Sequence, residues 1–515
     1  MKRRSFLKTT GAIALGAHAT ANNVFGFVPA HNWEKYDFGS GPVVKGRLNQ
    51  GPFPIYEPEV VAPNSEVVMT TTPSNKIIKN FGMGLTVYVS GDIGPPKIAG
   101  ESLEKSIEDL VKLPFVQKIY LRPNWRDIQK QPGKLDFPDY WKITFDLAKQ
   151  YDKRIGFRIM TENPDILELG VPEFLIDKIP YHSLNGRWDH SSPIRGKKKH
   201  KFPEYNHSKY QKAFTELNEL LANELNGNRQ IEYMDTFMYG FWGEGHSWPF
   251  EGNPFPDNVT AEKTFVKMFD TQLNYWTKTP LTTNTQPDFS RVGNSELVDK
   301  TIRTHNWLRT DTIYIENMQI ESLSNRPAWV AAICEVGMGT LKRHEENMSE
   351  GIGYNDNLIS HVMDAGANYW SVWNWHNISA RNILDYYEKY PESIDKLNKK
   401  IGYRVRPSWI WSFNKGENPG LIMGFVNDGI AGVPGILRVT VFNDSGSVNV
   451  TGGLDAGYPK PTGVRQAMFM LPKGTDWKGL KVKAEIDVKG VHYPVEWACH
   501  QKLNKDGSLT LKTNM

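Results

Sequence analysis

Short apolar runs separated by longer segments of helical spacing occupy the middle of the chain, from about residue 81 to residue 400. The runs that we predict to be strands are 83–90, 116–123, 154–160, 233–242, 280–285, 311–316, 329–335 and 367–373. Between several of them, segments such as 103–113, 139–151 and 210–225 place apolar residues three and four positions apart, as amphipathic helices do. Eight strands with crossover helices predict a (β/α)8 TIM barrel over residues 81–400, although the connection from the sixth strand to the seventh is short.

The spacing changes after residue 400, where apolar and polar residues alternate. The segments 436–444, 465–471, 480–488 and 493–500 predict strands joined by turns. We therefore predict an α/β fold with a C-terminal antiparallel β-sandwich over residues 401–515. This sandwich is either structural or sugar-binding. Residues 27–80 are rich in proline and glycine, with β-prone pieces such as EVVMTTT, and indicate an N-terminal extension that packs on another part of the chain.

The first 26 residues have the order of features of an export signal. Arg3 and Arg4 precede a mild apolar stretch, and alanines suited to cleavage follow it. This order predicts a twin-arginine-type signal peptide and a periplasmic or extracellular protein. The alternative is a basic cytosolic N-terminus. No later run holds 18 apolar residues, so we expect no membrane span.

Charge and cysteine content exclude several classes of protein. The chain has 61 basic and 57 acidic residues, and the leader holds four of the basic ones and none of the acidic ones. The remainder therefore carries no net charge, which disfavours nucleic acid as a partner. Two cysteines, Cys334 and Cys499, are too few for a disulfide framework and lack the spacing of a zinc site. We expect no cofactor and no metal.

The residues that end the predicted barrel strands are candidates for chemistry, because a TIM barrel places its active site there. They combine carboxylates, arginines, amides and aromatic rings. The candidates are Arg122, Trp125, Arg158, Glu244, His246, Asn284, Glu316, Glu335, Trp373, Trp375 and His376, with Glu162 as a weaker one. Two carboxylates on one face are what glycoside hydrolysis needs, one as acid and one as nucleophile or base.

Four segments resemble clan-A barrel glycosidases, including the family-42 β-galactosidases and related barrel proteins with a W-G-E-W-H-like segment. They are IYLRPNWRDIQKQPGKLDFPDYWKITFDLAKQYDKRIGFRI, FMYGFWGEGH, AWVAAICEVG and ANYWSVWNWH. The resemblance covers roughly residues 80–410. It implies that Glu244, after the fourth strand, is the acid/base and that Glu335, after the seventh, is the nucleophile. One position departs from the pattern: Gly243 stands where clan A has asparagine.

Local chemistry gives each glutamate a functional and a structural interpretation. Glu244 lies near Trp242 and Trp248, so we expect partial desolvation to raise its pKa and keep it protonated. Glu335 ends an apolar strand, where a nearby arginine such as Arg122 or Arg158 would keep it ionised. The structural alternatives are a surface-loop glutamate at 244 and a buried arginine-paired glutamate at 335.

Other candidates also keep two interpretations. Glu316 is a binding or structural residue and the reserve nucleophile. The aromatic group Trp373, Trp375 and His376 forms a sugar platform or simply closes the barrel. His246 and Glu244 are two residues apart, which is no recognised metal-ligand spacing on a helix.

The sequence as a whole predicts an exported retaining glycoside hydrolase acting on poly- or oligosaccharides. The basic run 194–202 is either a solvated loop or a contact for an anionic polysaccharide, such as a sulfated algal galactan with β-galactosides. The alternative is a barrel that binds glycans without hydrolysing them, which the missing asparagine supports. An open groove with both glutamates would favour the enzyme, and a glutamate held in a buried ion pair would favour the binder.

Overall fold

The structure, a computed structural model, describes residues 41–50, 65–90, 94–166, 168–186, 199–247, 250–285, 292–310, 323–337, 354–373 and 379–512. The chain divides into two compact units, residues 1–40 and residues 41–515. The predicted signal peptide lies outside the described residues.

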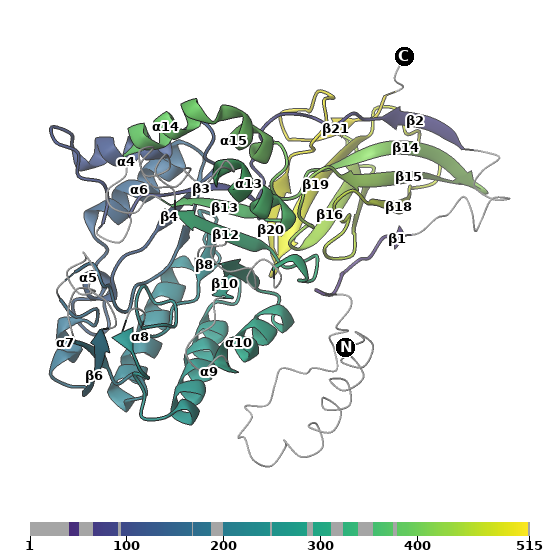
Figure 1. Ribbon diagram of the computed structural model, residues 1–515. Helices are drawn as coiled ribbons and strands as arrows, with labels where there is room; N and C mark the ends of the chain where they lie inside the picture. Colours follow the sequence, from purple (N-terminus) through teal and green to yellow (C-terminus); the bar gives the residue numbers. More distant parts are fainter. Residues whose placement is uncertain are drawn as a thin grey trace, which may run out of the picture. The chain divides into compact units, whose positions relative to one another are not determined.

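Eight parallel strands close into a barrel, which confirms the predicted fold class (Figure 1). Around the barrel their order is β10-β11-β12-β13-β3-β4-β5-β8. The strands are β3 (Gly84–Tyr88), β4 (Lys118–Leu121), β5 (Arg154–Phe157), β8 (Ile231–Asp235), β10 (Leu281–Asn284), β11 (Trp307–Thr310), β12 (Ala332–Gly337) and β13 (Tyr369–Trp373). Strands buried on both faces are rich in apolar residues, as β3 and β13 are, although β10 (LTTN) is mostly polar.

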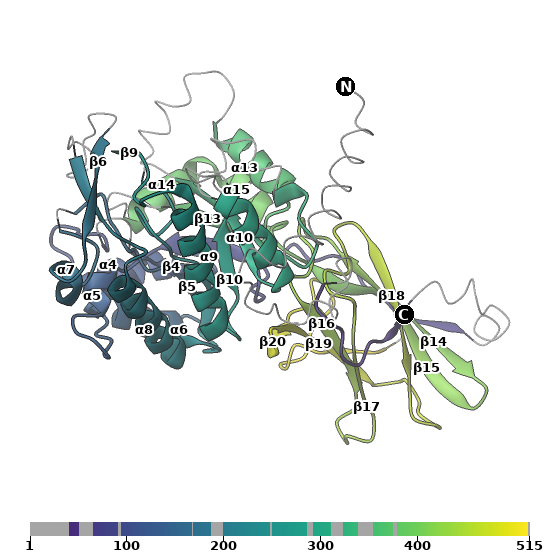
Figure 2. The ribbon, with the colours of Figure 1, turned by 90° about the horizontal axis from the view of Figure 1, so that it is seen from below.

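Helices surround the strands on the outside of the barrel (Figures 1 and 2). They are α4 (Leu103–Val111), α5 (Trp125–Ile128), α6 (Asp139–Gln150), α7 (Glu173–Ile176), α8 (Ser208–Leu225), α9 (Asn258–Tyr275), α10 (Val292–Arg303), α13 (Tyr354–Asp364), α14 (Ala380–Lys389) and α15 (Pro391–Asn398). Side-chain caps fix where some of them begin. The Ser102 side chain accepts a hydrogen bond from the Lys105 amide at 3.1 Å, and Asp257 accepts one from the Thr260 amide at 2.7 Å.

Two predicted barrel strands differ from the observed ones. The fourth was predicted to run to residue 242, but β8 ends at Asp235, because the backbone of residues 236–247 forms a tight loop. The sixth was predicted at 311–316, but β11 occupies Trp307–Thr310 and residues 311–316 lie outside the described residues. Arg309 interrupts the apolar run of β11, which hid this strand from an argument based on hydrophobic pattern.

The C-terminal region forms two antiparallel sheets, as predicted. One has the order β1-β18-β15-β14-β2, and the other has β17-β16-β19-β20 with β21 paired to β19. Their bounds are β1 (Asn49–Gln50), β2 (Glu66–Thr70), β14 (Val405–Lys415), β15 (Asn418–Asn427), β16 (Ile436–Phe442), β17 (Asn449–Gly453), β18 (Val464–Met470), β19 (Lys481–Val488), β20 (Val491–Val495) and β21 (Leu509–Thr510). Two strands from residues 27–80, β1 and β2, thus form the edges of the first sheet.

A small third sheet, of order β7-β6-β9, is inserted in the barrel half of the chain. Its strands are β6 (Tyr181–Gly186), β7 (Lys199–Pro203) and β9 (Phe250–Glu251). In the described part of the chain, no helix combines the length and the apolar character needed to cross a bilayer.

The barrel and the C-terminal sheets share a hydrophobic cluster. It joins Tyr233 and Tyr369 of the barrel to Phe425 and Trp497 of the sheets. At the same junction, the ring of Phe81 stacks on that of Tyr493 with centroids 3.7 Å apart. Contact of this kind stabilises the two regions together.

Lys489, in the turn between β19 and β20, places its ammonium group against the barrel. The residue is only partly buried as a whole, but its Nζ donates to the Trp276 carbonyl and to Asn306 Oδ1, each at 2.9 Å. Burial lowers the pKa of Lys489 from its usual 10.5 to about 7. Between pH 7 and 10.5 the unfolded chain therefore binds the proton more strongly than the folded chain, so this group makes stability rise with pH.

We expect Lys489→Met to gain less stability than the wild type between pH 7 and pH 9. Burial also lowers the pKa values of Lys118 and Lys153 to about 8. These two lysines add the same rise of stability with pH to the wild type and to the variant. The measurement is the thermal midpoint of both proteins at pH 7, 8 and 9. Parallel curves would contradict the assignment.

Candidate active site

Charged side chains gather at the carboxyl ends of five barrel strands. Arg122 follows β4, Arg158 follows β5, Asp235 ends β8, Arg309 lies in β11 and Glu335 lies in β12. All five residues are at most 2% exposed. A charge buried this deeply requires a partner, so their contacts with one another decide what the site can do.

Glu244 joins this cluster of charged side chains from the loop after β8. Its amide donates to the Phe241 carbonyl at 3.0 Å, and the Phe241 amide donates to the His246 carbonyl at 2.9 Å. The amide of Trp242, which has a φ of 54°, donates to the Glu162 carbonyl at 2.7 Å. These bonds hold the loop closely, so the position of Glu244 is set by the backbone.

Gly243 shows why asparagine is missing before Glu244. Its φ is +75°, and a Cβ added there would lie 2.8 Å from the Ile159 carbonyl oxygen. Neither the conformation nor the space suits a larger residue. The departure from the clan-A pattern is therefore a requirement of this loop, which brings Glu244 to the site nine residues after the end of β8.

Arg309 contacts three carboxylates with one guanidinium group. Its Nε lies 3.3 Å from Asp235 Oδ2, its Nη1 lies 3.4 Å from Glu244 Oε1, and its Nη2 contacts Glu335 Oε2. The planar fork of arginine suits such multiple contacts. The carboxylates of Glu244 and Glu335 therefore contact the two different terminal nitrogens of the Arg309 guanidinium group.

Glu244 is also paired with Arg158 and His246. Arg158 Nη2 donates to Glu244 Oε1 at 2.6 Å, and His246 Nε2 lies 3.1 Å from Glu244 Oε2. Burial by itself would raise the pKa of Glu244, but Arg158, the His246 hydrogen bond and Arg309 outweigh it and hold that pKa well below its usual range. The predicted raised pKa was wrong, because Arg158 and Arg309 belong to distant barrel strands and outweigh the effect of burial.

Tyrosines complete the inner wall of the site. Tyr120 donates its hydroxyl hydrogen bond to Asp235, and the Thr282 hydroxyl also donates to Asp235. Tyr120 stacks on Tyr88 with centroids 4.5 Å apart, and the Arg122 guanidinium lies 5.0 Å from the Tyr88 ring centroid. Burial raises the pKa of both tyrosines, so they remain neutral hydrogen-bond donors.

The structure brings some predicted residues into this site and places others elsewhere. Arg122, Arg158, Glu244, His246 and Glu335 belong to it, and Asn284 is buried at the end of β10. Trp125 does not: it is fully buried in the hydrophobic core, where its Nε1 donates to Gln129 at 2.8 Å. That it binds substrate stays a prediction, and a large aromatic residue after a strand serves core packing equally well.

Several predicted positions are not described. Glu316, Trp375 and His376 lie outside the described residues, and of Trp373 only the backbone, at the end of β13, is described. Glu162 is fully buried and accepts a hydrogen bond from the Gly170 amide at 3.2 Å. Among the described side chains, no group of three or more histidines, cysteines or acids is arranged to hold a metal ion.

Two central residues, Asp235 and Arg309, were missed by reasoning from the sequence. Asp235 stood inside the overlong fourth strand, and Arg309 stood before the misplaced sixth strand. Each is a charged residue in an otherwise apolar run, in YMDTF and WLRT. A charge in a strand that is buried on both faces is itself a signal of a functional or paired group.

Comparison with protein-family models gives no match, and no curated protein matches in sequence. The solved structures that are similar include the catalytic domain of β-amylase from Paenibacillus polymyxa, with 11% identity and a TM-score of 0.41, covering 61% of this chain and 98% of that one. Endo-glycoceramidase II from Rhodococcus sp. has 11% identity and a TM-score of 0.36, covering 77% and 99%. A glycoside hydrolase family 30 subfamily 8 xylanase from Clostridium acetobutylicum has 9% identity and a TM-score of 0.35, covering 79% and 99%.

Similarities this distant assign no activity. The resemblance to family-42 β-galactosidases remains a prediction from sequence.

Proposed function

We propose that the protein is a retaining glycoside hydrolase, with Glu335 as nucleophile and Glu244 as acid/base. The observation that carries the proposal is the contact of both carboxylates with the single guanidinium of Arg309. Two carboxylates on one guanidinium group are compatible with a mechanism in which one attacks the anomeric carbon and the other serves the leaving oxygen.

The steps follow from these positions. Glu335 would attack the anomeric carbon and form a glycosyl ester, while protonated Glu244 gives its proton to the departing oxygen. Glu244 would then take a proton from water, which attacks the same carbon and releases Glu335. Arg309 contacts both carboxylates, so its positive charge stabilises the ionised nucleophile but opposes protonation of Glu244.

The substrate and location follow as proposals from the sequence. We propose that the protein is exported through its N-terminal signal and acts on poly- or oligosaccharides, with β-galactosides of sulfated galactans among them. Part of the basic run is described in β7, where Lys199 and Lys201 are exposed and His200 between them is buried. Outward-facing lysines suit contact with an anionic glycan.

The pH dependence of hydrolysis should reveal the role of Arg158. Because Glu244 must carry a proton in the first step and its pKa is held low, kcat/KM should fall as pH rises from the acidic range. In Arg158→Met, the charge that lowers this pKa most is gone, so the fall should occur at higher pH.

The matched control is Arg158→Lys, which keeps a positive charge and should keep the profile near that of the wild type. Profiles of kcat/KM against pH for the three proteins would be compared. An Arg158→Met profile that coincides with the wild type would remove Glu244 from the acid role.

One observation favours the second candidate, a glycan-binding barrel without hydrolysis. Glu244 is held in a buried ion pair with Arg158 at 2.6 Å, which is the arrangement expected of a structural glutamate. In that case the barrel would bind a glycan that neither the wild type nor Glu335→Gln cleaves. Product release and binding measured on the same glycans separate the two functions.

A further inference from the structure

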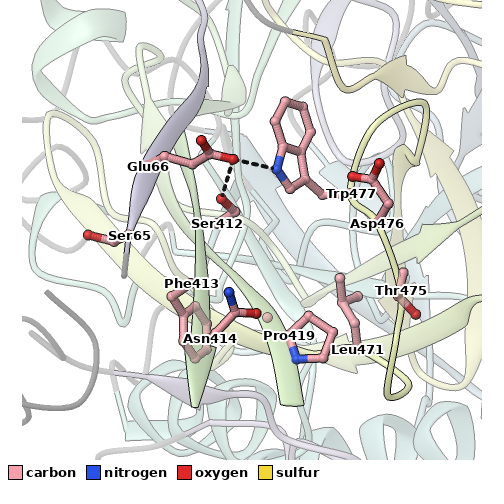
Figure 3. A pocket seen from close by; sticks show the side chains of 11 residues that line it. Ser65, Glu66, Ser412, Phe413, Asn414, Pro419, Leu471, Thr475, Asp476 and Trp477 are labelled. Carbon is pink, nitrogen blue, oxygen red and sulfur yellow. Dashed lines mark hydrogen bonds between the residues drawn. The ribbon is translucent and has the colours of Figure 1, made fainter. Parts of the chain in front are cut away.

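A cavity of about 510 Å³ lies in the first C-terminal sheet, away from the charged cluster of the barrel. Figure 3 shows its lining side chains around an open centre. They come from the start of β2, the end of β14, the start of β15 and the loop after β18. The lining residues are Ser65, Glu66, Ser412, Phe413, Asn414, Pro419, Gly420, Leu471, Thr475, Asp476 and Trp477.

Long-range hydrogen bonds build one wall of this cavity. Trp477 Nε1 donates to Glu66 Oε1 at 2.9 Å, and the Ser412 hydroxyl donates to the same oxygen at 3.3 Å. These three residues come from widely separated parts of the chain, and the bonds orient both the indole ring and the carboxylate (Figure 3). The wall is therefore formed before any ligand binds, which lowers the entropic cost of binding.

The cavity carries acidic but no basic side chains. None of the eleven described residues that line it is lysine, arginine or histidine, whereas Glu66 and Asp476 are both acidic. Lys473, in the same loop, forms an ion pair with Glu417. Two carboxylates without a lining cation disfavour sulfated or carboxylated ligands, because like charges repel.

The lining matches a polyhydroxylated neutral molecule. Glu66 and Asp476 accept hydrogen bonds, and the Asn414 amide can donate and accept them. The accessible lining is mostly polar, and Trp477, Pro419 and Leu471 add a small apolar surface of the kind that packs against the C–H face of a sugar ring. The volume falls within the range of about 300–1,000 Å³ that is usual for small-molecule sites.

We infer that this cavity is a second carbohydrate site, which binds a neutral saccharide independently of the barrel. It shares no residue with the cluster around Arg309. The inference goes beyond the proposed function, because it holds whether or not the barrel hydrolyses its substrate. Of the two interpretations of the C-terminal sheets, the inference favours sugar binding over a purely structural role.

Calorimetric titration of the full chain tests the inference, in a Glu335→Gln background so that no probe is cleaved. The probes are neutral oligosaccharides derived from agarose, xylan, cellulose and laminarin, with κ-carrageenan oligosaccharides as sulfated counterparts. We expect at least one neutral probe to bind, and binding to the cavity to weaken at least tenfold in Asn414→Ala/Asp476→Ala. Both residues are exposed, so this change should leave the fold intact.

Two further variants make the result specific. Trp477→Phe keeps an aromatic ring but removes the hydrogen bond to Glu66, and it should weaken binding of the neutral probe to the cavity. Asp444→Ala, at an exposed acid of the other sheet paired with Lys481, should leave it unchanged. The inference is overturned if no neutral probe binds, if the cavity variants bind like their parent, or if the sulfated probe binds as tightly as the neutral one.

Failure here and failure of the proposed function remain distinguishable. Binding that the cavity variants leave intact would belong to the barrel and would exclude only the second site. Hydrolysis retained by Glu335→Gln, or absent from the wild type, would count against the proposed function and say nothing against binding to the cavity.

Discussion

Glu335→Gln is expected to reduce the release of sugar by several orders of magnitude while leaving the fold intact. Glutamine has nearly the size and shape of glutamate, but its amide cannot attack the anomeric carbon to form the glycosyl ester. Arg309 would keep its contacts with Asp235 and Glu244 in the variant. The measurement is reducing-sugar release from a panel of neutral and sulfated galactans and other plant and algal glycans.

The control is Glu417→Gln, which removes a carboxylate from an exposed ion pair with Lys473 and should leave turnover unchanged. Proton NMR of the first product adds a separate test, because a retaining mechanism releases a product with the same anomeric configuration as the substrate. Turnover by Glu335→Gln at the wild-type rate would exclude this nucleophile. Release of the opposite anomer would indicate an inverting mechanism, in which Glu335 acts as the base that activates water.

Arg309→Met is expected to lower the free energy of unfolding by about 3–5 kcal/mol, the usual loss when one partner of a buried ion pair is removed. The methionine fills similar space, so the loss comes from charge and not from a cavity. Asp235 and Glu335 would each keep a buried carboxylate without the guanidinium that now contacts it. Urea denaturation followed by tryptophan fluorescence measures the change.

A surface arginine provides the matched control. Arg381 pairs with Asp385 and Glu388, and 59% of its side chain is exposed, so Arg381→Met should cause no comparable loss, because solvent screens such pairs. A double variant, Arg309→Met with Glu335→Gln, should recover part of the stability by removing one of the unpaired charges. Equal losses for the two arginines would show that the buried network does not hold the barrel together.

The positions of most barrel strands follow from local sequence. In β3 and β13, burial on both faces demands mostly apolar or small residues, so the run of residues marks the strand. The helical segment 139–151 matches α6 within one residue, because its apolar positions must face the barrel. The strand β11, which contains Arg309, was not found, whereas β8 and β12 were found in spite of Asp235 and Glu335.

The protonation of Glu244 could not be obtained from its neighbours in sequence. Local aromatic residues suggested desolvation and a raised pKa. The guanidinium groups that reverse this direction belong to Arg158 and Arg309, which are 86 and 65 residues away. Electrostatic partners across a barrel are set by strand order and register, and neither is visible in a local pattern.

The sequence by itself therefore determined the alternation of strands and helices, the eightfold barrel and the antiparallel C-terminal region, and it pointed to two carboxylates of the charged cluster, Glu244 after β8 and Glu335 in β12. These features could be predicted because burial selects for apolar side chains residue by residue, and that selection is visible in the local sequence. The tertiary structure alone decided that Arg309 joins three carboxylates, that Trp125 packs in the core, and that Glu66 meets Trp477 in a cavity. Such contacts depend on which strands close beside one another, and closure is a property of the whole chain.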